Sequence, residues 1–226
     1  MMKLDIKLMA SASIKFLMGL VLVGLLIFLP AGTLHYSCGW LLMAVLFVPM
    51  FIAGVVMAIR APELLKKRLK AKEKEDEQKS VVAMSGIMFI AAFVVAGLNY
   101  RYSWSIMPSW VVWSAVALFL LSYLMYAEVL RENAYLSRTI EVQQGQKVIE
   151  TGLYGIVRHP MYSATIVLFL SMPLVLGSLP SFVIMLVYIP LIVKRIKNEE
   201  EVLLDGLDGY ADYCSKVKYR LLPFVW

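Results

Sequence analysis

Long apolar runs alternate with short charged segments along the whole chain, a pattern typical of a membrane protein rather than of a soluble domain. Four of these runs carry no charged residue, at residues 16–29, 40–59, 81–98 and 110–127. A helix of about 20 predominantly apolar residues is long enough to cross the hydrocarbon core of a bilayer. The first 130 residues therefore predict four membrane-spanning helices.

Two further apolar runs follow, at residues 161–176 and 181–193, with the sequence GSLP between them. At 16 and 13 residues, both are marginal as separate spans. They predict a tight helical hairpin that crosses only partly or extends into flanking residues. The predicted fold class is an all-α, polytopic membrane helical bundle with five to six membrane helices, including this C-terminal hairpin.

The distribution of basic residues predicts how this bundle is oriented in the membrane. Lys and Arg occur in the N-terminal segment, in the connectors 60–79 and 131–160, and in the C-terminal tail, whereas the other loops contain only Arg101. Basic loops face the cytoplasm, so this alternation predicts six crossings with both termini cytoplasmic. The net charge of +6 is spread over these loops, and we expect no nucleic-acid partner.

Cysteine usage gives no sign of a metal site or a disulfide. The chain has two cysteines, Cys38 and Cys214, and no CxxC motif. The predicted topology places them on opposite sides of the membrane. We therefore expect neither a structural metal nor a disulfide.

A polar cluster, TGLYGIVRHPMYS at residues 151–163, stands immediately before the first arm of the hairpin. Proline is favoured at the first position of a helix, so Pro160 predicts a helix start with His159 at the N-cap. Backbone N–H groups and the positive end of the dipole at such a start suit an anion. Arg158 adds a positive charge, and Tyr154 and Tyr162 add aromatic rings with hydroxyls.

A second polar group lies after the hairpin. Arg195 and Glu199 are four residues apart, so they share one face of a helix, and Glu200 is adjacent. Taken alone, Arg195 and Glu199 fit an ordinary ion pair at a membrane boundary, and His159 fits a capping or packed histidine. Because the predicted topology brings both groups to the cytoplasmic side, a shared functional site is the stronger interpretation.

The sequence GLYGIVRHPMYS, followed by EEEVLL and GYADYCSKVKYRLLPFVW, resembles the membrane methyltransferase superfamily that includes isoprenylcysteine carboxyl methyltransferase and the phospholipid N-methyltransferases, particularly its small prokaryotic members. The resemblance covers about residues 130–226. Three positions depart from the family pattern, because Leu153, Ala164 and Phe224 stand where Pro, Gly and Gly are common. These positions affect how closely the backbone approaches a cofactor, and no charged or aromatic motif residue is lost.

The resemblance implies a cytoplasmic site for S-adenosyl-L-methionine (SAM), open to lipid and built from residues 131–226, with residues 1–130 supplying membrane helices and the charged connector 60–79. Arg195 matches the residue that faces the methyl acceptor. The residues expected to bind the cofactor are Gln143, Gln146, Lys147, Val148, Ile149, Tyr154, Arg158, His159, Tyr162, Glu199 and Glu200. In this scheme Glu199 would neutralise the SAM ammonium, and the helix start with Arg158 would receive its carboxylate.

The function expected from this resemblance is SAM-dependent methylation of a lipid or lipid-like acceptor in a prokaryotic cell membrane, with S-adenosyl-L-homocysteine (SAH) as product. Methyl transfer is an in-line displacement that needs alignment more than acid–base catalysis, so no metal is expected. Two alternatives stay open. One is an NADPH-dependent reductase of the sterol-reductase type, and the other is a non-catalytic membrane protein that uses the same scaffold for binding.

Overall fold

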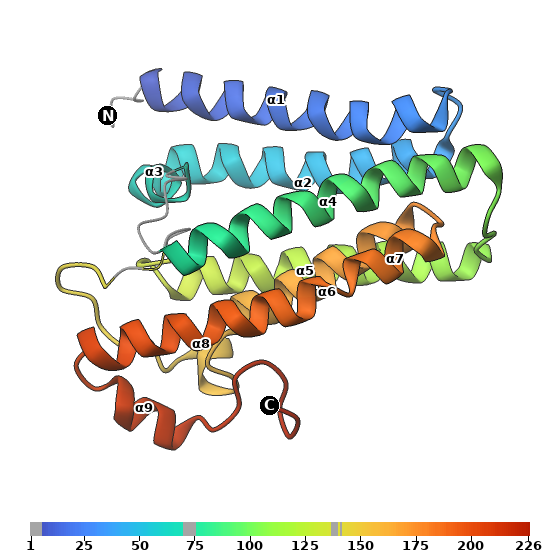
Figure 1. Ribbon diagram of the computed structural model, residues 1–226. Coiled ribbons are helices and arrows are strands. Elements are labelled where there is room, and N and C mark those ends of the chain that lie inside the picture. The colour runs from blue at the N-terminus through green and yellow to red at the C-terminus, as the bar shows by residue number, and fades with distance from the viewer. Residues whose placement is uncertain (1–5, 70–75, 137–139, 141) are drawn as a thin grey trace.

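The computed structural model describes residues 6–69, 76–136, 140 and 142–226, which form helices and loops without a strand. Figure 1 shows the long helices running side by side as one bundle. The elements are α1 (Ile6–Ala31), α2 (Ser37–Arg60), α3 (Pro62–Leu69), α4 (Asp76–Tyr102), α5 (Ser109–Glu132), the short 3-10 helix η1 (Gly152–Gly155), α6 (Pro160–Val175), α7 (Leu179–Met185), α8 (Tyr188–Gly206) and α9 (Tyr210–Lys216).

Five helical segments of the described chain are long and apolar enough to cross a membrane. Four of them are α1, α2, α4 and α5, and the fifth joins α7 and α8 over Leu179–Gly206. Helix α6 is apolar but has 16 residues, fewer than a full span needs. The predicted all-α membrane bundle with five to six membrane helices is therefore confirmed, with α6 as the short sixth helix.

The C-terminal hairpin reverses at a tight turn between α6 and α7. Gly177 adopts a φ of +69°, a conformation that favours glycine, and the Ser178 side chain then caps α7 by accepting a hydrogen bond from the Ser181 N–H. The second arm is longer than its apolar run, because α8 continues through the polar sequence to Gly206. This extension carries Arg195 and Glu199 out of the apolar region and into the charged end of the bundle.

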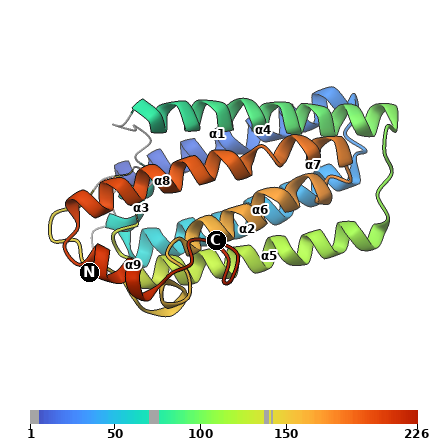
Figure 2. The ribbon, with the colours of Figure 1, turned by 60° about the horizontal axis from the view of Figure 1, so that its bottom comes forward.

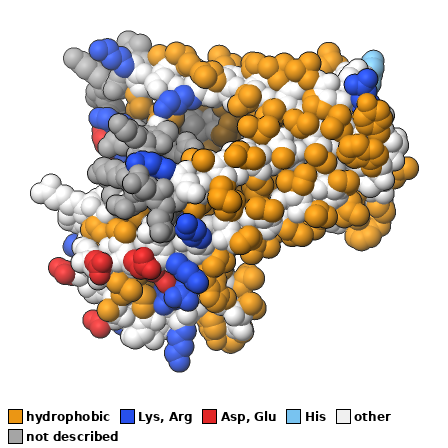
Figure 3. Space-filling model, viewed as in Figure 1, with side chains coloured by type: hydrophobic (Ala, Val, Ile, Leu, Met, Phe, Trp, Pro, Cys, Tyr) orange, Lys and Arg blue, Asp and Glu red, His pale blue; other side chains and the backbone are white. Residues whose placement is uncertain are grey.

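The two ends of the bundle differ in character. Apolar side chains cover its flanks in Figure 3, while most charged side chains in that view gather at one end. That end holds α3, the connector 133–159, the end of α8, α9 and the tail, and Figure 2 shows the same grouping from another direction. The sequence-based expectation that the connector, the helix start at Pro160 and the segment after the hairpin meet at one end is confirmed.

Helix α3 supports the connector from the side. Lys67 donates a hydrogen bond to the Ala134 carbonyl at 3.3 Å and lies over the Tyr135 ring. Arg68 donates to the Tyr126 hydroxyl on α5. Helix α3 therefore holds the first residues of the connector 133–159 against the bundle.

Candidate functional site

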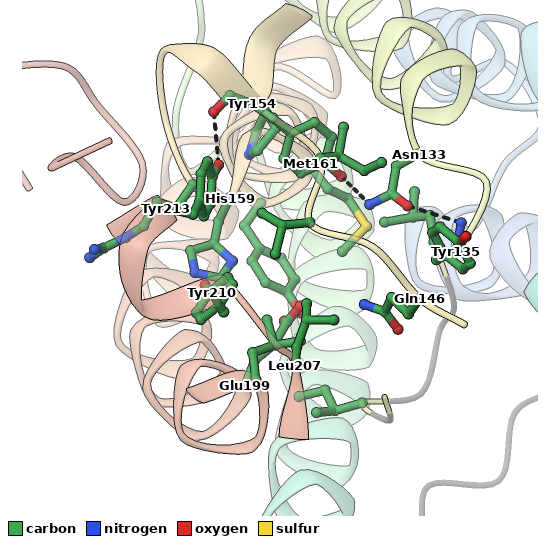
Figure 4. A pocket seen from close by; sticks show the side chains of 18 of the residues that line it. Asn133, Tyr135, Gln146, Tyr154, His159, Met161, Glu199, Leu207, Tyr210 and Tyr213 are labelled. Atoms are coloured by element: carbon green, nitrogen blue, oxygen red, sulfur yellow. Dashed lines mark hydrogen bonds between the residues drawn. The ribbon is translucent and has the colours of Figure 1, made fainter. Parts of the chain in front are cut away.

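A pocket opens at the charged end, where the connector, the start of α6, the end of α8 and α9 converge. Its space, including the mouth, is about 850 Å³. Figure 4 shows the lining from close by. The lining residues are Asn133, Tyr135, Leu136, Ile140, Gln146, Lys147, Val148, Ile149, Tyr154, Arg158, His159, Pro160, Met161, Tyr162, Arg195, Glu199, Leu203, Leu207, Tyr210 and Tyr213.

Tyr162 joins two charged residues of α8, Arg195 and Glu199. Its hydroxyl donates a hydrogen bond to Glu199 Oε2 and accepts one from Arg195 Nε at 3.0 Å. Glu199 and Arg195 share a face of α8, as their spacing predicted, and Tyr162 is the first-turn residue of α6 that reaches them. The pocket thus presents a carboxylate and a guanidinium at fixed positions, bridged by a buried hydroxyl.

The connector forms one wall of the pocket. Gln146 and the segment 147–149 line it as predicted, but Gln143 does not. The Gln143 amide donates to the Tyr135 carbonyl, and its backbone N–H donates to the Gln146 side chain at 2.9 Å. Gln143 therefore shapes the turn that carries the wall, and its side chain is occupied within the connector.

Tyr154 makes hydrogen bonds to the residue that follows α5 and to a residue of α9. Its hydroxyl accepts a hydrogen bond from Asn133 Nδ2 at 2.9 Å, and its carbonyl accepts one from the Tyr213 hydroxyl at 2.8 Å. Burial raises the pKa of Tyr154 to about 12, although the Asn133 hydrogen bond opposes this rise. Gly152, two residues earlier, has a φ of +57°, and a Cβ there would lie 3.0 Å from Glu132 Cγ. The GLYG sequence therefore permits the tight turn that packs Tyr154 against α5.

Helix α9 contributes two tyrosines that the sequence analysis did not single out. Tyr210 and Tyr213 are 4% and 2% exposed, and their rings lie 5.7 Å apart at their centroids. Burial raises the pKa of both hydroxyls. The Tyr210 hydroxyl is buried with no hydrogen-bond partner among the described residues. In the sequence, the local sign of this pair was that the two tyrosines of GYADY are three positions apart, a spacing that puts both rings on one side of a short helix.

The helix start at Pro160 has the predicted N-cap residue, and the loop before it is paired with the tail. His159 is the N-cap residue and Pro160 begins α6. The backbone N–H groups of Arg158 and His159 donate to the Tyr219 and Arg220 carbonyls, both at 2.9 Å. These two N–H groups precede the first helical residue, so the expectation that the helix start receives a ligand carboxylate stays a prediction.

Glu200 points away from the pocket, although its neighbour Glu199 lines it. Glu200 is 6% exposed and lies next to Arg158, His159 and Arg220. Within the described ranges, no group of three or more His, Cys, Asp or Glu side chains is arranged to hold a metal ion. Of the residues predicted to form the site, all except Gln143 and Glu200 line the pocket.

Part of the chain is similar to a known protein family. Residues 115–205 match the model of the isoprenylcysteine carboxyl methyltransferase (ICMT) family. This region contains the connector wall, the start of α6 and the Arg195–Glu199 face, whereas α9 and the tail lie beyond it.

Two individual proteins are similar to the chain. Over 91 residues it is 31% identical to the delta(14)-sterol reductase of Mus musculus, an alignment that covers 39% of this chain and 22% of the reductase. The chain thus spans about a fifth of that relative's length. The solved structure of the eukaryotic intramembrane Ras methyltransferase ICMT is also similar, with a TM-score of 0.47 and 16% identity over 96% of this chain and 86% of that one.

Proposed function

We propose that this chain is an integral-membrane methyltransferase that uses SAM and methylates a lipid or lipid-like acceptor, such as an isoprenylcysteine-type carboxylate or a phospholipid. The observation that carries the proposal is the Arg195–Tyr162–Glu199 arrangement in a pocket of the region that matches the ICMT family model. A carboxylate and a guanidinium at one pocket suit a ligand with a cationic group and an acceptor with an anionic group.

The charge and the aromatic side chains of the lining suit SAM. Glu199 is the acidic side chain of the lining and would hold the ligand's ammonium group. The rings of Tyr154 and Tyr213 are rigid aromatic surfaces that suit an adenine or a sulfonium. Residues 146–149 would form the wall beside the adenosine.

In this proposal the protein contributes alignment. SAM, when bound, supplies a methyl group on a sulfonium and leaves as SAH after an in-line displacement by the acceptor. Glu199 would orient the ammonium end, and Arg195 would hold an acceptor carboxylate or phosphate by paired hydrogen bonds. Because Tyr162 contacts both side chains, the two ligands would be fixed relative to each other, which lowers the entropic cost of reaching the transition state.

We further propose a division of labour and an orientation. Residues 131–226 would carry the cofactor-binding region and residues 1–130 the supporting helices, in a prokaryotic cell membrane. The charged end, with both termini, would face the cytoplasm. Single cysteines introduced at Lys218 and Ile106 of a cysteine-free variant test this with an impermeant maleimide. Intact cells should label only the Ile106 position, and labelling of Lys218 alone would reverse the orientation.

Binding of SAH to the purified protein, measured by calorimetry, tests the cofactor. Glu199→Gln should weaken SAH binding by about tenfold or more, since a charge-assisted hydrogen bond contributes about 1.5–3 kcal/mol. Glu201→Gln is the matched control, because Glu201 is exposed on the same helix and outside the lining. Absence of SAH binding by the unmodified protein would contradict the proposal. Mass spectrometry of lipids incubated with methyl-labelled SAM would identify the acceptor.

An NADPH-dependent reductase is the second candidate, because the aligned 91 residues are 31% identical to a sterol reductase. Such an enzyme needs basic groups for the 2′-phosphate. The basic residues of the lining are Lys147, Arg158 and Arg195, and Arg158 is paired with Glu200. Competition between NADPH and SAH separates the two candidates. If NADPH binds and SAH does not, the reductase is correct. If neither binds, the scaffold is non-catalytic.

A further inference from the structure

Glu200 is a buried carboxylate whose two oxygens both face protein groups. Arg158 Nε lies 2.9 Å and His159 Nε2 lies 3.1 Å from Glu200 Oε1. Arg220 Nε donates to Glu200 Oε2 at 2.7 Å. The Arg158 contact is an ion pair without hydrogen-bond alignment. Glu200 therefore connects the loop before α6 with the tail, and protein groups engage both oxygens of its carboxylate.

The tail is paired with the same loop along the backbone. The N–H groups of Arg158 and His159 donate to the carbonyls of Tyr219 and Arg220. One turn into α6, the Ser163 hydroxyl donates to the Leu221 carbonyl at 2.7 Å. Arg220 thus holds the loop through its carbonyl and holds Glu200 through its guanidinium. Residues 219–221 lie beyond the region that matches the ICMT family model, yet they fix the loop that carries His159.

The contact with Glu200 selects one form of the His159 imidazole. A carboxylate accepts hydrogen bonds only, so Nε2 of His159 must carry the proton. Two arginines beside Glu200 favour its ionised form. The Nδ1 atom is then the acceptor that the imidazole can offer to a ligand in the pocket that His159 lines. The His159 ring also stacks on Tyr162, with centroids 5.7 Å apart, so its orientation is linked to the Arg195–Tyr162–Glu199 arrangement.

We propose that Glu200 is a positioning residue for His159, holding the imidazole as the Nε2–H tautomer and clamping residues 219–221 to the loop, so that Nδ1 accepts a hydrogen bond from the ligand. The inference rests on the proposed function only for the identity of that ligand. It differs from the sequence-based expectation, in which Glu200 itself binds the cofactor.

Nitrogen-15 NMR of histidine tests the tautomer directly. The chain has two histidines, so His35→Gln leaves His159 as the single imidazole. In the ligand-free protein at neutral pH, we expect a protonated Nε2 and an unprotonated Nδ1. Addition of SAH should shift the Nδ1 resonance. A protonated Nδ1 in the ligand-free protein would overturn the inference, as would SAH binding that leaves Nδ1 unshifted.

Two variants and a control separate positioning from folding. Glu200→Gln should populate the second tautomer and raise the dissociation constant for SAH about tenfold, and an unchanged tautomer and affinity would contradict the inference. Arg220→Gln should keep the tautomer, because the His159–Glu200 contact remains, but weaken SAH binding by loosening the tail. Glu201→Gln should change neither. The tautomer in the ligand-free protein is measured without SAH, so a failure of the proposed function leaves this measurement decisive for the role of Glu200.

Discussion

The hydroxyl of Tyr162 donates a hydrogen bond to the carboxylate of Glu199, joining the first turn of α6 to α8 across the pocket. Tyr162→Phe removes this bond and the one from Arg195. Both charged side chains then lose a fixed partner, and we expect SAH affinity to fall about tenfold, or about 1.4 kcal/mol. Calorimetry in detergent measures this change.

The control for Tyr162 is Tyr188→Phe. The Tyr188 hydroxyl is 2.9 Å from the Thr165 hydroxyl, and Tyr188 is buried outside the pocket lining. Like Tyr162→Phe, Tyr188→Phe removes one phenolic hydroxyl from a buried side chain. SAH affinity should therefore stay within about twofold of the unmodified protein. Equal losses in the two variants would mean that the Tyr162 effect is one of stability alone.

The two tyrosines of α9 should respond to phenylalanine in opposite directions. Tyr210→Phe removes a buried hydroxyl that has no partner among the described residues, so the ligand-free protein should become more stable, by up to about 1–3 kcal/mol. Tyr213→Phe removes the donor to the Tyr154 carbonyl and should cost about 1 kcal/mol. Thermal unfolding in detergent measures both. A loss of stability in Tyr210→Phe equal to that in Tyr213→Phe would show that the Tyr210 hydroxyl has a partner.

Sequence reasoning was sufficient for the helices because their signal is local. The apolar runs and Pro160 at a helix start each depend on a few adjacent residues. The face shared by Arg195 and Glu199 follows in the same way, from the helical period of 3.6 residues.

The sequence EEE alone could not predict that Glu200 is buried against Arg158, His159 and Arg220 while Glu199 lines the pocket. Adjacent residues on a helix point about 100° apart, and which one faces the pocket depends on how α8 packs. The pairing of residues 158–159 with residues 219–220 joins irregular segments about 60 residues apart, and no periodic pattern marks it. The Tyr210 and Tyr213 contribution depends on the same tertiary placement of α9.

Alkaline pH should weaken the fold around Tyr154. Its pKa is raised from 10.0 to about 12, so the folded protein holds the phenolic proton more tightly than the unfolded chain. The stability from this shift is fully present below pH 10 and is lost as pH rises through about 12. Between pH 9 and 11 we expect this group to lower the free energy of unfolding by about 1 kcal/mol. The free energy of unfolding should fall less steeply with pH in Tyr154→Phe than in the unmodified protein. An equal pH dependence in both proteins would exclude Tyr154 as its source.

Gly97 sets the closest approach of α4 to α1. A Cβ at this position would lie 2.5 Å from the Ile27 carbonyl oxygen and 3.0 Å from the Ala31 nitrogen, both backbone atoms. Backbone atoms cannot turn aside as a flexible side chain can, so Gly97→Ala must push the two helices apart. Small residues at such contacts are what let membrane helices pack closely. We expect Gly97→Ala to lower the free energy of unfolding by about 1–3 kcal/mol or more.

Gly86 lies on the same helix and provides the matched control. A Cβ there meets no atom within 4 Å, so Gly86→Ala introduces no clash. In a helix interior, alanine is favoured over glycine by about 0.8–1.0 kcal/mol, and Gly86→Ala should therefore be neutral or stabilising. Unfolding midpoints of the two variants in one detergent compare them directly. A similar loss in both would mean that glycine flexibility along α4, rather than the contact with α1, determines the result.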